Sequence, residues 1–334
     1  MTMVSLGDLA RSLMLQRHTT SANTRLTRLT QEVASGRHAD QAAAARGDLG
    51  PLAAIEGALA RLDGWQVAAA GLSTRLDTMQ TALGALNGIG DSLSTLLVAA
   101  GTASQADQVD LAGGEAADYL SAAIGVLNAR AGDQSVFAGT RTDRPALTTA
   151  DELLDALLPA LAGATTAAGV EAAVQAWFDD PSGFASQAYS GGPAQSAIAV
   201  GPGQSLAPGV TATDPALKSL LAGLATAALL DRGILADAPL ERRELAARAG
   251  AGLMANATDR TMLAARIGIG QGQLAEAQAR NAAEETALGL ARSGLVAADP
   301  YTTATELEAT RSQLETLYTL TARLAGLSLI EVLR

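Results

Sequence analysis

The prolines of this 334-residue chain are concentrated in one region, and this feature constrains the fold more than any other. Eight of the ten prolines lie between Pro145 and Pro239, and none occurs at 52–144 or 240–299. A proline inside a helix costs about 3 kcal/mol, so the two proline-free stretches can hold long helices. The sequence therefore predicts helical flanks around a middle of different character.

Apolar residues repeat with a coiled-coil period in both proline-free stretches. We expect one helix over about 50–100, a second over about 105–130 and a third over about 240–292, with Gly294 and Asp299-Pro300 as breaks. Spacings of three and four residues are typical of a heptad seam. The seam positions are Leu52, Ile55, Leu59, Leu62, Leu72, Leu76, Met79, Leu83, Leu86, Leu93 and Leu97 before the middle, and Leu263, Ile267, Leu274, Ala277 and Leu288 after it.

The two ends of the chain are also helical in pattern and free of internal proline. Terminal segments usually fray unless something holds them, so a continuing apolar stripe implies a partner, either the opposite end or another subunit. We expect the following side chains to form an assembly interface: Leu6, Leu9, Leu13, Leu26, Leu29 and Val33 at one end, and Leu307, Leu314, Leu317, Leu320, Leu324, Leu327 and Ile330 at the other.

The middle reads as a small mixed α/β region. A short β-type run with turn residues at 134–148 predicts a hairpin. Beyond it we expect a helix at 150–178 and strands at 187–200 and 205–211. Only 3% of all residues are aromatic, and four of them, Trp177, Phe178, Phe184 and Tyr189, lie in this region, where they could form a small core of their own.

Composition excludes several functions. The net charge of −11 argues against nucleic acid as a partner. The chain has no cysteine, two histidines (His18 and His38) and no apolar run long enough to span a bilayer. Read alone, these features, with no evident signal peptide, favour a soluble cytosolic protein that inserts into no membrane.

No motif predicts catalysis. The glycines of 268–273 lack the strand and the Lys-Ser/Thr of a phosphate loop, and Asp179-Asp180 precedes a turn without a histidine nearby. We therefore expect no enzyme activity, no cofactor and no metal site.

Three stretches together resemble the bacterial flagellin superfamily. Residues 23–37 are similar to the family's N-terminal helix with its Ser-Gly-Lys/Arg turn, and residues 128–145 to its helix-to-hairpin junction. The region from Ala264 through 299–301 to the Leu-rich end is similar to its C-terminal helices. The most specific part is the family motif at Phe137, Gly139, Thr140 and Asp143.

The resemblance implies a structural protein of the extracellular flagellum, exported by the type III apparatus without a cleaved signal peptide. Within the family it favours the hook-associated branch that forms the hook–filament junction, with filament flagellin as the alternative. The implied partners are a hook-associated protein, flagellin subunits, further copies in a ring-like layer and a cytosolic export chaperone on the C-terminal helix. A cytosolic coiled-coil signalling or adaptor protein remains the alternative of another class.

The expected fold is mainly α. Both chain ends build a long helical rod or coiled coil, with a β-hairpin and a small inserted α+β outer domain. The expected divisions are inner terminal-helix segments at 1–45 and 299–334, rod segments at 46–145 (with the hairpin) and 238–298, and the outer domain at 146–237.

Overall fold

The computed structural model describes the backbone of residues 6–44, 48–102 and 107–332, and side chains within these ranges except at 6–9, 43–44 and 324–332. The chain divides into two compact units, one formed by Met1–Arg61 with Ala283–Arg334 and the other by Leu62–Ala282. We call these the terminal unit and the body. The five-part division expected above stays a prediction.

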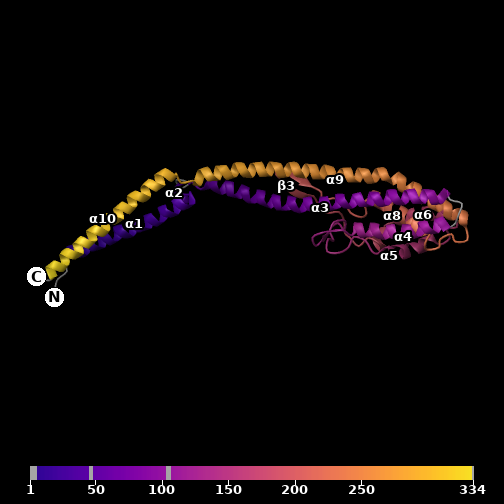
Figure 1. Ribbon diagram of the computed structural model, residues 1–334, viewed down its shortest axis with the longest axis horizontal. Coiled ribbons are helices and arrows are strands. Elements are labelled where there is room, and N and C mark those ends of the chain that lie inside the picture. The colour runs from indigo at the N-terminus through magenta and orange to yellow at the C-terminus, as the bar shows by residue number, and fades with distance from the viewer. Residues whose placement is uncertain (1–5, 45–47, 103–106, 333–334) are drawn as a thin grey trace. The chain divides into compact units, whose positions relative to one another are not determined.

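The fold is mainly α, as predicted, with two small antiparallel sheets in the described residues (Figure 1). The long helices are α1 (Leu6–Ser35), α3 (Gly50–Thr102), α4 (Asp107–Leu127), α9 (Pro239–Val296) and α10 (Pro300–Val332). The shorter elements are α2 (Gln41–Ala44), α5 (Ala150–Leu157), the 3₁₀ helix η1 (Leu158–Leu161), α6 (Ala167–Asp179), α7 (Phe184–Gln187) and α8 (Pro215–Ala228). The strands are β1 (Arg130–Ala131), β2 (Gln134–Ser135), β3 (Ile198–Gly201) and β4 (Gln204–Leu206).

One continuous apolar core fills the body. It extends from Ala69 on α3 to Ala277 on α9 and includes the predicted seam residues from Leu72 to Leu97 and from Leu263 to Ala277. The other predicted seam positions lie outside this core: Leu52, Ile55, Leu59, Leu62 and Leu288. Helix α8 is almost entirely buried, because it packs against both α4 and α6. The predicted aromatic cluster also forms there: the Phe178 and Phe184 rings stack with centroids 4.9 Å apart, and Trp177 meets both edge-on.

The expectation that no apolar run is long enough to span a bilayer is wrong by length and composition. Helix α3 contains such a window, with a mean hydropathy of 1.3, and it is the one such helix in the described ranges. In the structure 39% of that window is buried inside the protein. A buried core helix passes the same test of length and composition, and the seam leucines of α3 from Leu72 to Leu97 do lie in the core.

The predicted hairpin at 134–148 is wrong in position. The paired strands are β1 and β2, in the register Arg130 with Ser135 and Ala131 with Gln134. Gly132, at φ +58°, makes the turn between them. After Ser135 the chain pairs with other loops instead of with a second strand, so residues 136–146 are irregular.

Other predicted boundaries in the middle also need correction. The single helix expected at 150–178 is three pieces, because Pro159 and Gly163 (φ +91°) interrupt it. The strand expected at 187–200 is formed only at 198–201, and its partner only at 204–206, around Gly203 at φ +66°. Gly294 does not break α9, which continues to Val296.

Candidate assembly site

Helices α1 and α10 run antiparallel beside each other in the terminal unit (Figure 1). We call them the terminal pair. The buried positions on α10 follow a heptad spacing, and α1 supplies a matching row. Arg25 and Glu306 form an ion pair of 2.8 Å across the pair. The buried residues are Ala22, Leu29 and Glu32 on α1 and Thr303, Leu307, Thr310 and Leu314 on α10.

The structure brings together only some of the predicted interface leucines. Leu29, Leu307 and Leu314 are buried, and Leu26 and Leu317 are partly buried beside them. Leu13, Val33 and Leu320 instead remain 50%, 44% and 47% exposed. The side chains of Leu6, Leu9, Leu324, Leu327 and Ile330 lie outside the described residues.

Threonine hydroxyls along the terminal pair are bonded within their own helices. Many of them donate to the carbonyl four residues earlier: Thr27 to Asn23 at 3.0 Å and Thr319 to Glu315 at 2.8 Å are examples. A hydroxyl satisfied in this way costs little when a partner covers it. The threonines therefore suit a surface that another helix can cover.

Short caps end α1 and begin α10. Gly36, at φ +66°, donates its N–H to the Glu32 carbonyl at 2.8 Å, and this left-handed residue closes α1. Asp299 Oδ1 accepts from the Tyr301 N–H at 2.9 Å and caps α10. These backbone hydrogen bonds, with Thr302 the largest contributor, lower the pKa of the Asp299 carboxyl. The predicted Ser-Gly-Arg turn is confirmed by this geometry.

The two caps are tied to each other by backbone pairing. Arg37 and Ala297 form an antiparallel bridge in which His38 N–H donates to the Val296 carbonyl at 2.9 Å. The Ala298 N–H donates to the Gly36 carbonyl at 3.0 Å. Glu32 adds a bond from the Ala39 N–H at 3.0 Å, although its carboxylate is buried. The bridge fixes where the terminal pair starts.

The predicted motif residues lie in the body, where Phe137, Gly139 and Thr140 contact irregular loops. Phe137 is fully buried, and its carbonyl accepts from the Ala212 N–H at 3.0 Å. Gly139 has φ +59°, and a Cβ there would lie 2.3 Å from the Gly192 carbonyl oxygen. The Thr140 N–H donates to the Pro193 carbonyl at 2.9 Å. Asp143 is exposed beside Arg144, at 3.3 Å.

Arg75 of α3 clamps this motif, and sequence patterns did not single it out. Its guanidinium donates to the Val136 carbonyl and to Gln195 Oε1, both at 2.8 Å. Gln195 in turn donates to the Gly139 carbonyl at 2.9 Å. Burial lowers the pKa of the Arg75 guanidinium, and the neighbouring Tyr189 opposes that shift. The available signal was an arginine one residue before the seam leucine Leu76.

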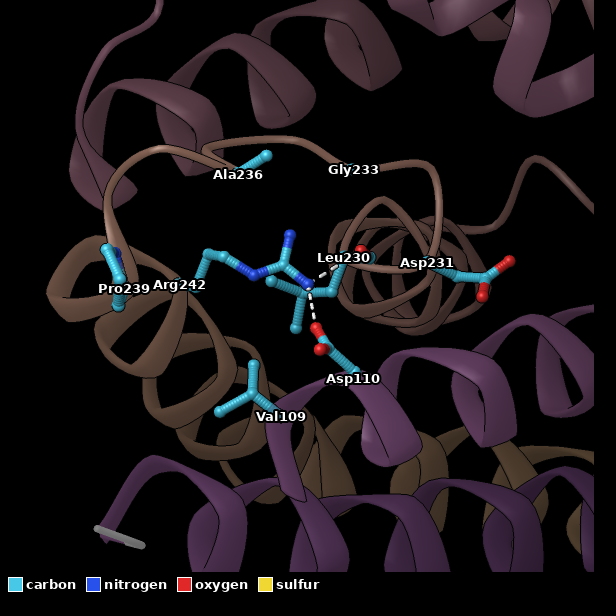
Figure 2. A pocket seen from close by; sticks show the side chains of 8 residues that line it. All are labelled: Val109, Asp110, Leu230, Asp231, Gly233, Ala236, Pro239 and Arg242. Atoms are coloured by element: carbon cyan, nitrogen blue, oxygen red, sulfur yellow. Dashed lines mark hydrogen bonds and ion pairs between the residues drawn. The ribbon is translucent and has the colours of Figure 1, made fainter. Parts of the chain in front are cut away.

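One hollow with charged walls has its arginine bonded to groups of the protein itself. A cavity of about 370 Å³ lies between α4 and the loop before α9. Figure 2 shows Arg242 reaching Asp110 and the Leu230 carbonyl within it, the latter at 3.0 Å. Arg242 also donates to the Ile234 carbonyl at 2.9 Å. The arginine therefore anchors this loop, and its guanidinium is already bonded to groups of the protein.

Within the described residues, no group of three or more histidine, aspartate or glutamate side chains could hold a metal ion. His18 is exposed, and His38 Nδ1 lies 3.8 Å from Glu32. Gly268 and Gly270 lie inside α9, as the helical interpretation of that stretch predicted. Asp179 forms a 3.0 Å ion pair with Lys218 and Asp180 bonds Ser182, so both aspartates have local partners.

Comparisons with known proteins give limited similarity. No protein-family model matches the chain, and no curated protein matches it. Among solved structures, the chain is similar to one described as a "putative flagellar hook-associated protein from Vibrio parahaemolyticus". The sequences are 16% identical, the match covers 73% of this chain and 95% of that one, and the TM-score is 0.48. A TM-score below 0.5 does not establish a shared fold, so similarity alone assigns this chain to no family.

Proposed function

We propose that this chain is a structural subunit of the bacterial flagellum. In this proposal it joins a hook-associated protein to the flagellin filament, and its terminal pair packs against neighbouring subunits of the same ring-like layer and of the layers on either side. The sequence motifs of the flagellin superfamily support this assignment. It further implies export without a cleaved signal peptide and a chaperone that covers α10 before export.

One observation carries the proposal: the terminal pair leaves large apolar side chains uncovered. Leu13, Val33 and Leu320 are each more than two-fifths exposed, and Met14 and Tyr318 are more exposed still. Two helices can cover only one stripe of each other. Burying apolar surface gains about 25 cal/mol per Å², so further helices that cover the remaining stripes would stabilise the pair.

The threonine hydroxyls remove the main cost of such burial. Thr24, Thr27 and Thr30 on α1 each donate to a carbonyl of their own helix at 2.8–3.0 Å. Thr316, Thr319 and Thr321 do the same on α10 at 2.7–2.9 Å. A partner helix could therefore cover these faces without leaving an unpaired donor.

The first experiment places a charge on the uncovered face. Leu13→Glu and Leu320→Glu should leave the unfolding of the purified monomer unchanged, because both side chains are already half in water. They should prevent incorporation into flagella and release unpolymerised flagellin into the medium. The matched control is Val67→Glu on α3, which is 69% exposed in the body. Normal assembly by both terminal variants would contradict the proposal.

A second experiment separates the junction role from filament flagellin. In sheared flagella a junction protein should be a trace band, whereas a flagellin would dominate the preparation. A deletion strain should export flagellin that does not polymerise. Detection only in the cytosol, with none in sheared flagella, would favour the coiled-coil adaptor instead.

Limited proteolysis of the purified monomer tests whether the terminal helices are less stable than the body before assembly. Both ends should be removed before the body, because the described side chains of the terminal pair bury only a thin seam. Resistant ends would count strongly against assembly by folding on binding.

A further inference from the structure

Helices α3 and α9 lie antiparallel beside each other in the body, and each carries a strict seven-residue row of core positions (Figure 1). Both rows are apolar except at a single pair of positions and at the far end of α9. The row on α3 is Leu62, Ala69, Leu76, Leu83, Gly90 and Leu97, and the row on α9 is Leu253, Arg260, Ile267, Leu274 and Asn281. Arg260 on α9 and Gly90 on α3 therefore face each other at positions where the rest of each row is mainly leucine or another apolar residue.

Arg260 is only 1% exposed, and most of its donors have acceptors. Its Nε donates to Asn87 Oδ1 at 3.0 Å and its Nη2 to Asp91 Oδ1 at 2.9 Å, both on α3. Its Nη1 donates to the Leu253 carbonyl at 3.1 Å and to Asn256 Oδ1 at 3.0 Å on its own helix. Four hydrogen bonds use four of the five N–H groups of a guanidinium.

Gly90 makes room for this guanidinium. A Cβ at residue 90 would lie 2.8 Å from Arg260 Cζ and 2.8–2.9 Å from both terminal nitrogens. Every other side chain would therefore displace the arginine. Gly84 and Gly88, on the same helix, have nothing within 4 Å of such a Cβ, so this close approach distinguishes Gly90 from its neighbours.

We propose that Arg260, seated against Gly90, is a register lock that fixes the axial alignment of α3 and α9. Rows of leucine alone fit together equally well after a shift of seven residues, whereas one polar core residue can specify a single register. After such a shift the guanidinium would face Leu83 or Leu97. Gly84 or Val98 would then replace Asp91, leaving the buried charge without its carboxylate.

The alignment matters for the rest of the body. Asn281, the last member of the α9 row, donates to the Val200 carbonyl at 2.7 Å and holds the β3–β4 hairpin against the helix. A shift of one heptad moves that contact by about 10.5 Å. The lock depends on the fold of the body alone and is independent of the proposed flagellar role.

Because the chain has no cysteine, disulfide formation between introduced cysteines can report the axial register of α3 and α9 without interference. Gln271 donates to Asp77 Oδ1 at 2.6 Å across the two helices, so Asp77→Cys with Gln271→Cys reports the native register. Asp77→Cys with Ala264→Cys, or with Gln278→Cys, reports a shift of one heptad in either direction. Disulfide formation in the full-length monomer is compared among the three pairs, in the natural background and in two variants.

The two variants are Arg260→Leu and the double variant Gly90→Leu with Arg260→Leu, which makes both rows apolar. In the natural background only the native pair should cross-link efficiently. In the variants we expect the shifted pairs to cross-link about tenfold more than in the natural background, with a matching loss from the native pair. Arg266→Leu, which removes an exposed arginine of α9 bound to Asp214 at 2.8 Å, is the control and should change nothing.

Two results would overturn the proposal. One is native-pair cross-linking alone in both variants, at the natural yield. The other is loss of helical circular dichroism in both variants, because Arg260 would then be required for folding and not for alignment.

Discussion

The terminal pair and the body use the same kind of amphipathic helix but differ in how completely they bury it. In the body, α3 is surrounded by α9 and by the elements that follow it, and its seam residues from Leu72 to Leu97 are at most 2% exposed. In the terminal pair, α1 and α10 pack on each other, and threonine, alanine and glutamate share the seam with leucine. An apolar repeat therefore makes a closed core only where enough other elements surround it.

We expect the body and the terminal pair to have different roles, the body in stability and the terminal pair in assembly. We expect the body to fold from its own contacts, because its core is continuous and buried hydrogen bonds hold its loops. The terminal pair keeps uncovered apolar side chains that water tolerates but a partner would cover. Four measurements test whether the two regions differ in this way.

The largest effect should come from the motif in the body. Phe137→Ala removes a fully buried ring and should lower the free energy of unfolding by about 3–5 kcal/mol, measured by urea denaturation. The body is expected to lose stability as a whole, because Phe137 belongs to its single core. A decrease in the free energy of unfolding of only about 0.5 kcal/mol, as for a surface substitution, would show that Phe137 does not stabilise the body.

A pair of glycines separates backbone strain from close approach. Gly139 and Gly132 have φ of +59° and +58°, but a Cβ would strike the Gly192 carbonyl only at residue 139. Gly139→Ala should cost about 3 kcal/mol or more, because strain and crowding add. Gly132→Ala should cost about 1–2 kcal/mol, from the left-handed backbone alone. Thermal denaturation of both variants gives the difference, and equal losses would refute the close approach.

A leucine truncation in the terminal pair should have a local effect. Leu314→Ala should speed amide hydrogen exchange along α10 and shift the main urea transition by less than about 0.5 kcal/mol. The matched truncation in the body, Leu86→Ala, should shift that transition by about 2–5 kcal/mol. Comparable shifts for the two variants would mean that the terminal pair and the body unfold as one unit.

The smallest expected effect is a local loss of stability at the start of α10 at acidic pH. Hydrogen bonds from the Thr302 and Tyr301 backbone lower the pKa of Asp299 in the folded state, so the cap contributes fully above the unfolded pKa of about 3.9. That contribution is lost as the pH falls through the lower folded value. Amide exchange at the start of α10 should therefore rise relative to the rest of α10 below about pH 4. Asp299→Asn, which can cap but does not titrate, should remove this pH dependence.

Much of the helical architecture could be predicted because its signals are local. Proline placement and heptad spacing predicted α3, α4 and α9 and the mainly α fold, and Asp299-Pro300 predicted the start of α10. The middle was harder, since its short elements depend on particular breakers. Pro159 and Gly163 divide a stretch whose apolar pattern looked like one helix.

The candidate site was predicted in part. Sequence periodicity selected Leu29, Leu307 and Leu314, which the structure buries together, but it also selected Leu13 and Leu320, which remain exposed. Periodicity reports which face of a helix is apolar. It does not report how many neighbours exist to cover that face.

The sequence by itself determined where helices can form, because propensity, proline and caps act over a few residues. Only the tertiary structure decided which polar groups enter the core. Arg75 bonds Val136 and Gln195, which are 61 and 120 residues away, and Arg260 bonds Asn87 and Asp91, 173 and 169 residues away. A buried charge is stable only where its acceptors converge, and that convergence depends on how two distant helices align.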